Sequence, residues 1–345
     1  MSVEAAEENL REMAFQKIME EENKRKTDPN ETHERSLIIL GSKGVGKTTM
    51  IHRFLEKDDT PKPTIAIDYS FARKSGKSLA KNIVHVWEIG YTSSSLITAA
   101  IAGSSLKHSP HHTTLFIMLD LAKPETLWLD LEKIISAVES ALKTSYDAKI
   151  INEMKERKLR DIKKEPGMVV DPFPIRACII GGRYDEFKEF DADKKELIGK
   201  ILRAVAHSLC AGLYYHSSKD KILVRRTRDM LSQYGFGNHS TEIKCMDYDK
   251  PLAISAGADT FSLIDLNLPR AITTTNLDSI KDIFLAHIPQ EEISDSAFSE
   301  DPSNDPNFSE SIIDKLRTQR EQIISVSLTD MLEGQPEAIP VPDPF

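Results

Sequence analysis

The segment GSKGVGKT at residues 41–48 constrains this chain more than any other feature of its sequence. It matches the pattern G-x-x-x-x-G-K-[ST] in full, and it lies between a short apolar run and a stretch with helical periodicity. Glycines let such a loop wrap closely around an anion, while backbone N–H groups at a helix N-terminus point at it. The lysine adds positive charge, and the threonine hydroxyl is a ligand for Mg²⁺. The sequence therefore predicts a phosphate-binding loop that follows a β-strand.

The chain after residue 36 alternates short apolar runs with helical stretches, which is typical of a mostly parallel α/β sheet. The six expected strands lie at residues 37–40, 65–71, 83–88, 115–119, 175–180 and 212–216. Too few residues join the second strand to the third for a crossover helix, so these two form an antiparallel hairpin. A phosphate-binding loop in a six-stranded, mostly parallel sheet with one antiparallel strand predicts a Ras-like P-loop GTPase fold, with helical N- and C-terminal extensions.

Changes in composition divide the chain into three expected regions. Residues 1–34 form a charged helical arm, residues 35–290 a Ras-like nucleotide-binding domain, and residues 291–345 an acidic tail too poor in apolar residues to fold alone. Within the domain, a highly charged helical insertion with a solvated surface is expected near residues 143–171.

Both extensions carry apolar residues at helical spacing. In the arm these residues are Leu10, Met13, Phe15, Ile18 and Met19. In the tail they are Ile313, Leu316, Ile323 and the stretch 328–332. The tail pattern predicts one amphipathic helix that binds a partner, whereas the arm is equally consistent with docking and with a solvated helix.

The charge balance argues against several classes of partner. Across 345 residues, 45 basic and 54 acidic side chains give a net charge of -9, so neither nucleic acid nor an anionic membrane is expected to bind. No apolar run approaches the roughly 20 residues of a bilayer span, and no export or lipidation signal is apparent, so no membrane insertion is expected. The three widely spaced cysteines, Cys178, Cys210 and Cys245, are expected to be reduced.

The motifs that support GTP hydrolysis are altered. Thr64 opens the second strand, where a first switch closes on Mg²⁺ and the γ-phosphate. Where switch GTPases carry D-x-x-G and then a glutamine, residues 87–92 read WEIGYT. Glu88 replaces the aspartate, Gly90 comes one residue early, and no glutamine follows to orient the attacking water. Fast intrinsic hydrolysis is therefore not expected, and no catalytic residue is assigned.

The motifs that read the base are partly kept. Residues 181–185, GGRYD, take the place of N-K-x-D, with Asp185 retained and Arg183 in place of the lysine. An aspartate here accepts hydrogen bonds from guanine N1–H and the exocyclic amine, and an arginine side chain can lie over the base. The S-A-K loop that closes over the base is matched by residues 217–219, and its rival at residues 255–257 lies far downstream.

These motifs together predict a site for GTP or GDP with Mg²⁺. The expected nucleotide-binding residues are Gly41, Gly44, Val45, Gly46, Lys47, Thr48, Thr49, Arg183, Asp185, Ser217 and Lys219. Thr48 and Thr64 are the expected protein ligands of Mg²⁺. The alternative for Asp185 and Lys219 is that both are ordinary surface turn residues.

Three further phrases of the sequence carry a resemblance to a known family. They are PTIAIDYSF at 63–71, VWEIG at 86–90 and LDLAKP at 119–124, the last followed by Trp128. With these phrases in order, the chain resembles the dynein light intermediate chains, and most closely those of cytoplasmic dynein 2, over roughly residues 36–265.

The resemblance implies a non-catalytic subunit of a microtubule motor, bound to the cytoplasmic dynein 2 heavy chain and to other subunits of that motor. It also implies a role in retrograde intraflagellar transport and cilium assembly, with the intraflagellar transport machinery as a partner. The implied locations are the cytoplasm, the cytoskeleton, the cilium and the basal body.

Two other functions stay open on the residues alone. An active Ras-like switch GTPase that regulates trafficking would sense the γ-phosphate through Thr64, because loss of the glutamine slows hydrolysis without abolishing nucleotide binding. A small-molecule kinase or ATPase shares the P-loop, but it would need a substrate lid and a catalytic carboxylate or arginine set that the sequence does not display.

Overall fold

The computed structural model describes most of the chain. The described residues are 34–75, 81–101, 110–161, 172–237, 244–266, 277–291 and 306–332, together with Glu12, Met13, Phe15, Gln16, Lys17 and Met19. Contacts divide the chain into two units, residues 1–292 and residues 293–345, and each is considered by itself. Among the described residues, none of the helices has the length and hydropathy needed to span a bilayer.

The first unit is built on a seven-stranded sheet with the order β2-β3-β1-β4-β5-β6-β7. The strands are β1 (Glu34–Gly41), β2 (Ile67–Ser75), β3 (Lys81–Ile89), β4 (Thr113–Asp120), β5 (Arg176–Gly182), β6 (Gly212–Tyr215) and β7 (Ala253–Ile254). The pairs β2–β3 and β6–β7 are antiparallel, and all other neighbours are parallel. This mixed sheet with crossover helices is the Ras-like fold that the sequence predicts.

The predicted count of six strands is wrong by one edge strand. β7 pairs with β6 through only two residues, Ala253 and Ile254, which is too short for any alternating pattern to reveal it. It also adds a second antiparallel pair to the one that the sequence predicts. The predicted β2–β3 hairpin is confirmed, but β2 begins at Ile67 and continues through charged residues to Ser75.

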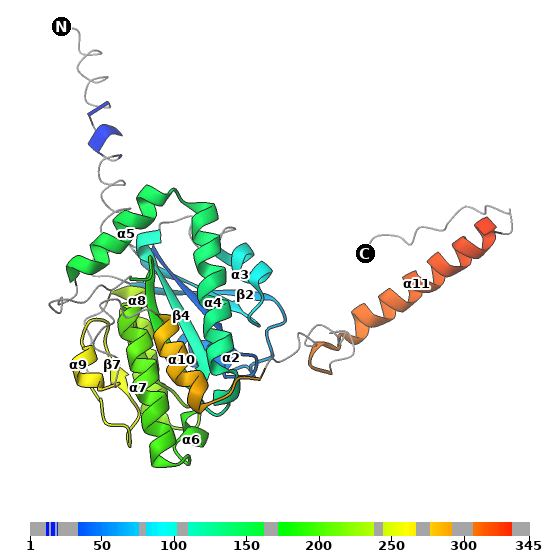
Figure 1. The fold of residues 1–345 in the computed structure, drawn as a ribbon. Helices are drawn as coiled ribbons and strands as arrows, with labels where there is room; N and C mark the ends of the chain where they lie inside the picture. Colours follow the sequence, from blue (N-terminus) through cyan, green and yellow to red (C-terminus); the bar gives the residue numbers. More distant parts are fainter. Residues whose placement is uncertain are drawn as a thin grey trace, which may run out of the picture. The chain divides into compact units, whose positions relative to one another are not determined.

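Helices cover both faces of the sheet (Figure 1). One face packs against α2 (Lys47–Leu55) and α8 (Lys221–Phe236). The other face packs against α3 (Ser94–Ala100), α4 (Pro124–Ser145), α7 (Ala192–Ser208) and α10 (Leu277–His287). The other helical elements described in this unit are η2 (Pro110–His112), α5 (Ala148–Asp161), α6 (Tyr184–Phe187) and α9 (Phe261–Ile264).

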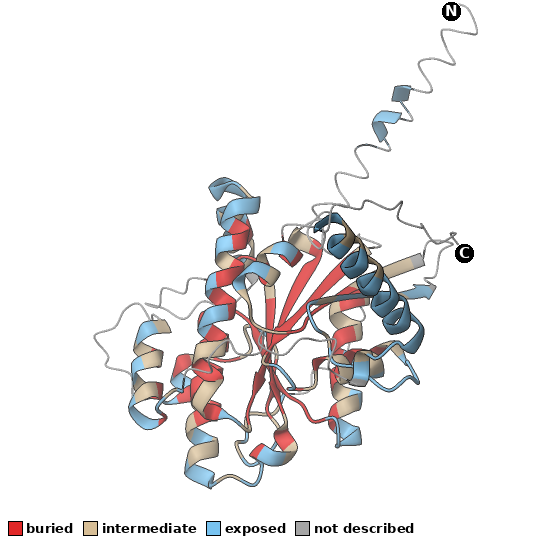
Figure 2. Cartoon of the chain, turned by 90° about the vertical axis from the view of Figure 1, so that its right-hand side faces the viewer, coloured by how far each residue is buried: buried red, intermediate tan, exposed pale blue. Residues whose placement is uncertain are grey.

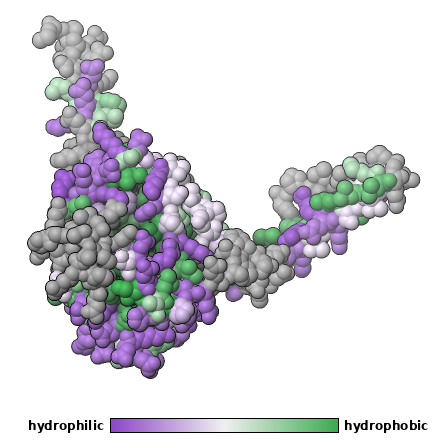
Figure 3. Space-filling view, in the orientation of Figure 1, coloured by the Kyte–Doolittle hydropathy of each residue, from purple (hydrophilic) through white to green (hydrophobic). Residues whose placement is uncertain are grey.

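The central strands are buried on both faces, as Figure 2 shows by their continuous red colour between the helices. Side chains of a strand alternate between its two faces, so in β1 Ile38 and Leu40 join the α4 side while Leu37 and Ile39 join the α2 side. A strand with apolar side chains on both of its faces is typical of a parallel sheet covered by helices. Hydrophilic residues cover much of the outer surface that Figure 3 displays.

The last described residues of this unit are tied to the start of α4. The side-chain amide of Gln290 accepts from the Trp128 N–H at 2.9 Å and donates to the Pro124 carbonyl at 2.9 Å. The Glu291 N–H also donates to the Glu125 carbonyl at 2.8 Å. These bonds join Gln290 and Glu291 to backbone groups in the first turns of α4. The folded unit therefore extends at least to residue 291.

The charged insertion contains two helical segments rather than a purely solvated surface. α4 continues to Ser145 and α5 follows, while residues 162–171 lie outside the described residues. In α5, Met154 is buried in the core and the Lys158 ammonium donates to the Ile175 carbonyl at 2.6 Å. The expectation that this segment exposes its charges is therefore wrong for Lys158, whose burial lowers its pKa to about 7.

The two extensions contain helical residues. Met13, Phe15 and Met19 in the arm are helical and exposed, whereas Leu10 and Ile18 lie outside the described residues. The second unit contains η5 (Pro306–Phe308) and α11 (Ser311–Leu332), and α11 holds every apolar position predicted for the tail helix. No residue of α11 is buried within this chain. Partner binding by α11 stays a prediction.

Candidate functional site

The P-loop and the two base-reading segments meet at one edge of the sheet. They follow the carboxyl ends of β1, β5 and β6. These three strands run in the same direction, because β4 pairs in parallel with both β1 and β5, and β5 pairs in parallel with β6. Ligands of open α/β sheets bind at this edge. A cavity of about 230 Å³ lies there, lined by Gly44, Val45, Gly46, Thr49, Arg183, Asp185, Glu186, His216, Ser218 and Lys219. The structure thus brings seven of the eleven predicted nucleotide-binding residues to one cavity, and the remaining four flank it within the P-loop and the β6–α8 loop.

The P-loop has the backbone that an anion cradle requires. Gly46, with φ of 104°, precedes the first residue of α2, and no side chain caps this helix N-terminus. Its first N–H groups therefore face the loop and are open to an anion. At Gly41 a Cβ atom would lie 2.0 Å from the Met118 carbonyl oxygen on β4, so only glycine fits where the loop leaves the sheet.

Lys47 lies inside the cradle and is bound by the protein itself. Its ammonium donates to the carbonyls of Gly41 at 2.8 Å, Ser42 at 2.8 Å and Gly90 at 2.9 Å. Only 4% of the residue is exposed, and burial lowers its pKa to about 8. An ammonium has three N–H donors, so all of them are used. A phosphate can reach this ammonium only by taking the place of one carbonyl.

Thr48 and Glu88 form the part of the site that suits Mg²⁺. The Thr48 hydroxyl donates to Glu88 Oε1 at 2.7 Å, and the other carboxylate oxygen has no hydrogen-bond partner among the described residues. Burial raises the pKa of Glu88, against the opposing effects of Thr48, Lys47 and Thr64. The hydroxyls of Thr48 and Thr64 thus both lie at this carboxylate, and oxygen donors of this type fit a hard cation. No cluster of three His, Cys, Asp or Glu side chains that could hold a metal ion is found in the described part of the chain, at this site or at any other.

The predicted base-reading residues contact one another. Asp185 accepts from the Ser217 hydroxyl at 2.7 Å and pairs with the Lys219 ammonium at 2.7 Å. Partial burial alone would raise the pKa of Asp185, but the bonds from Lys219 and Ser217 hold it below its usual value. The carboxylate is therefore ionised and fixed at the cavity wall, where it can accept hydrogen bonds from a guanine edge.

Arg183 is held at the cavity rim by two carboxylates. Its guanidinium donates to Asp120 at 2.9 Å and to Glu186 at 2.5 Å, and these partners raise its pKa. The residue before it, Gly182, stands where N-K-x-D motifs have asparagine. A Cβ there would lie 2.6 Å from the Val45 side chain, so the P-loop valine takes up the space of that asparagine.

Sequence reasoning missed three carboxylates of the site. Asp120 and Glu186 fix Arg183, and Asp130 on α4 accepts a hydrogen bond from the Ser42 hydroxyl of the P-loop. Burial raises the pKa of Asp130. Asp120 could have been found, because it ends a buried strand at the carboxyl edge of the sheet. Nothing in the sequence around Asp130 distinguishes it from a solvated helix residue.

Comparison with known proteins gives a consistent result over most of the chain. The chain is 33% identical over 312 residues to the cytoplasmic dynein 2 light intermediate chain 1 of Bos taurus, covering 86% of this chain and 88% of that protein. It is 32% identical over 318 residues to the protein of the same name in Danio rerio, covering 88% of each. The Homo sapiens protein is 32% identical over 311 residues, covering 85% and 87%. No protein-family model matches the chain.

A solved structure supports the same fold. The crystal structure of the conserved domain of a dynein light intermediate chain aligns with a TM-score of 0.54 and 16% identity, covering 79% of this chain and 99% of that one. The resemblance drawn from the phrases around the second, third and fourth strands is therefore confirmed. Given about one third identity over most of its length, the chain belongs to the family of cytoplasmic dynein 2 light intermediate chains.

Proposed function

We propose that this chain is a non-catalytic subunit of the cytoplasmic dynein 2 motor that binds and stabilises its heavy chain. In this role it serves retrograde intraflagellar transport and cilium assembly, at the cytoplasmic, cytoskeletal, ciliary and basal-body locations of that machinery. The observation that carries the proposal is the identity of about one third, over 86% of the chain, to a protein named for that motor. Neither nucleic acid nor a membrane is a partner in this proposal.

The arrangement at the P-loop supports a structural role over turnover. Lys47 donates to the Gly90 carbonyl, which ties the P-loop directly to the segment that stands in the place of the second switch. Beyond Gly90 the chain continues with Tyr91 and Thr92, so no glutamine follows at the place where Ras-like enzymes use one to orient the attacking water. A nucleotide bound here would stabilise the domain by mass action rather than by cycling between states.

The proposed ligand is GDP or GTP with Mg²⁺. The P-loop N–H groups and Lys47 would hold the phosphates, Thr48, Thr64 and Glu88 the metal, and Asp185 the guanine edge. Mg²⁺ would supply charge neutralisation between the phosphate oxygens. Ser217 and Lys219 already fix the Asp185 carboxylate, so guanine binding requires no rearrangement of that residue.

Replacing Asp185 with asparagine is expected to weaken GDP binding roughly tenfold to 150-fold, because a charge-assisted hydrogen bond contributes about 1.5–3 kcal/mol. Asparagine presents an amide N–H₂ that suits the extra carbonyl of xanthine, so affinity for XDP is expected to rise. Isothermal titration of the nucleotide-stripped protein with both nucleotides measures the change. Asp193→Asn on α7 provides the control. Equal affinities of wild type and Asp185→Asn for GDP would contradict guanine recognition by this residue.

An exposed apolar surface on β2 and β3 supports the partner-binding part of the proposal. Tyr69 and Phe71 are 45% and 52% exposed and lie on one side of the edge strand β2, and Ile65, two residues before that strand, is 43% exposed. Tyr69 lies against Trp87 of β3 at 4.6 Å between ring centroids. Clustered exposed aromatic residues on an edge strand are typical of protein interfaces.

The double substitution Tyr69→Ser with Phe71→Ser is expected to reduce co-purification with the heavy-chain tail of the same motor at least tenfold, because aromatic anchors contribute about 2 kcal/mol or more. The matched control is Ile150→Ser with Leu263→Ser, which also removes two exposed apolar side chains. Full retention by the double variant would exclude this surface as the contact. If the wild-type chain itself does not bind the heavy chain, the proposed function is wrong.

A further inference from the structure

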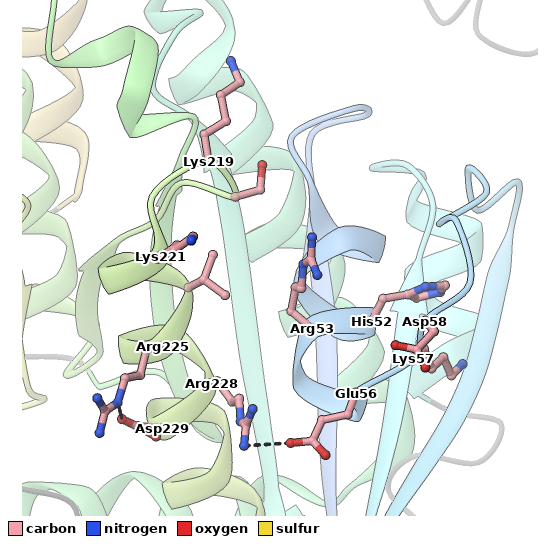
Figure 4. A pocket seen from close by; sticks show the side chains of 12 residues that line it. His52, Arg53, Glu56, Lys57, Asp58, Lys219, Lys221, Arg225, Arg228 and Asp229 are labelled. Carbon is pink, nitrogen blue, oxygen red and sulfur yellow. Dashed lines mark ion pairs between the residues drawn. The ribbon is translucent and has the colours of Figure 1, made fainter.

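A groove between α2 and α8 carries a charge opposite to that of the whole chain. Its volume is about 810 Å³, and its walls come from α2, the turn after α2 and the first three turns of α8 (Figure 4). The basic residues that line it are Arg53, Lys57, Lys219, Lys221, Arg225 and Arg228. The acidic residues that line it are Glu56, Asp58 and Asp229. This α2–α8 groove thus carries six basic and three acidic side chains, in a chain whose net charge is -9.

Three of the basic side chains are not engaged in an ion pair within the described part of the chain. Arg228 pairs with Glu56 at 2.8 Å across the lower end of the groove, as Figure 4 shows, and Lys219 pairs with Asp185. Arg225 lies 4.0 Å from Asp229 on its own helix. The remaining three, all exposed, are Arg53, Lys57 and Lys221. Lys57 donates only to the neutral Ser70 hydroxyl, at 3.0 Å.

These three cations come from both walls of the groove. Arg53 lies on α2 and Lys57 follows that helix, whereas Lys221 begins α8 on the opposite wall. The Glu56–Arg228 pair connects the end of α2 to α8. A ligand that lies in the groove therefore meets positive charge on both sides.

We propose that the α2–α8 groove binds an acidic segment of a partner protein, whose carboxylates pair with Arg53, Lys57 and Lys221. Guanidinium and ammonium groups recognise carboxylates through charge-assisted hydrogen bonds. The groove's own carboxylates, Glu56, Asp58 and Asp229, would repel a continuous polyphosphate, whereas a peptide can place its acidic residues at intervals between them. Lys57 of the groove reaches Ser70 on β2, so the groove adds a second protein contact beside the exposed Tyr69 and Phe71 of the proposed function.

The groove also meets the nucleotide cavity. Ser218 and Lys219 line both spaces. A peptide carboxylate at Lys219 would compete with Asp185 for the same ammonium, because their ion pair is exposed on the lysine side. A peptide in the groove would therefore weaken the ion pair that holds Asp185, the residue proposed to read guanine.

The test uses the full chain and a short fluorescein-labelled peptide rich in glutamate, with the same peptide carrying glutamine as its counterpart. Fluorescence anisotropy is expected to show binding of the glutamate peptide alone, with an affinity that falls as salt is added. The triple variant Arg53→Glu, Lys57→Glu, Lys221→Glu is expected to lose at least tenfold in affinity. The control Lys143→Glu, Lys149→Glu, Arg160→Glu changes the net charge equally on α4 and α5, and it is expected to bind within about twofold of wild type.

Three outcomes would overturn the proposal. They are equal losses in both triple variants, tighter binding of a labelled RNA or inositol polyphosphate than of the peptide, and absence of peptide binding at low salt. A zero-length amine–carboxylate cross-linker applied to the wild-type chain alone tests whether the chain's own acidic segment occupies the groove. Cross-links from Lys57 or Lys221 to carboxylates between residues 291 and 310 would assign the groove to the chain's own acidic segment instead. Because no heavy chain is present in these measurements, their failure leaves the proposed function intact.

Discussion

Replacing Lys47 with alanine is expected to lower the free energy of unfolding of the nucleotide-free protein by about 3 kcal/mol. The alanine variant leaves the carbonyls of Gly41, Ser42 and Gly90 without their donor. A buried acceptor that loses its partner costs about 1–3 kcal/mol, and relief from burying the ammonium offsets part of the sum. A P-loop lysine that served only to bind phosphate would show no such effect in the absence of nucleotide.

Urea unfolding of the stripped protein measures this change, and Lys43→Ala is the matched control. Lys43 lies in the same loop but is exposed, so its replacement is expected to alter stability by less than about 0.5 kcal/mol. Equal stabilities of wild type and Lys47→Ala would show that the three carbonyls are satisfied by other means. The structural interpretation of the cradle would then be wrong.

The pH dependence provides an independent check on Lys47. Its pKa in the folded protein is about 8 and its ordinary value is 10.5. As the pH rises through this interval, the folded state releases the proton first, so the unfolded state binds more protons and stability rises. The stability of wild type relative to Lys47→Ala is therefore expected to increase between pH 8 and 10.5. Affinity for phosphate is expected to fall over the same interval, because the ammonium loses its charge.

The features that sequence predicts well are local ones. The P-loop, the β2–β3 hairpin and the buried central strands are each defined by a few consecutive residues, since loop geometry and strand burial both act over short distances. Asp185, Ser217 and Lys219 are predicted from short motifs that follow two successive strands, and the structure places the three side chains in contact.

The features that sequence reasoning missed depend on contacts between distant segments. β7 forms because Ala253 and Ile254 pair with β6, and two residues are too few to show the alternating pattern by which a strand is recognised in a sequence. Asp130 is separated by 88 residues from the Ser42 hydroxyl that it binds. The α2–α8 groove likewise joins charges from residues 52–58 with charges from residues 218–229, and neither segment is unusual by itself. Such arrangements follow from the packing of helices on the sheet.

Replacing Arg203 with alanine is expected to lower the free energy of unfolding by about 3–5 kcal/mol, the largest effect predicted for this chain. Arg203 on α7 forms two parallel hydrogen bonds to Asp259, at 2.8 Å each, and donates to the Tyr248 hydroxyl at 2.6 Å. Only 3% of Arg203 and 6% of Asp259 are exposed. The alanine variant leaves a buried carboxylate with neither its counter-charge nor its two donors.

The double variant Arg203→Met with Asp259→Leu distinguishes two causes of the stability loss, namely a buried unpaired charge and a lost packing contact. It removes both charges and refills the space, so it is expected to recover most of the stability lost in Arg203→Ala. Thermal and urea unfolding of both variants give the comparison, and equal losses would assign the effect to packing.

The contact also anchors the segment that contains Tyr248, β7 and Asp259 onto α7. β7 pairs with β6, and the end of β6 leads to Ser217 and Lys219. Arg203→Ala is therefore also expected to weaken guanine-nucleotide binding from a residue that lies outside the cavity.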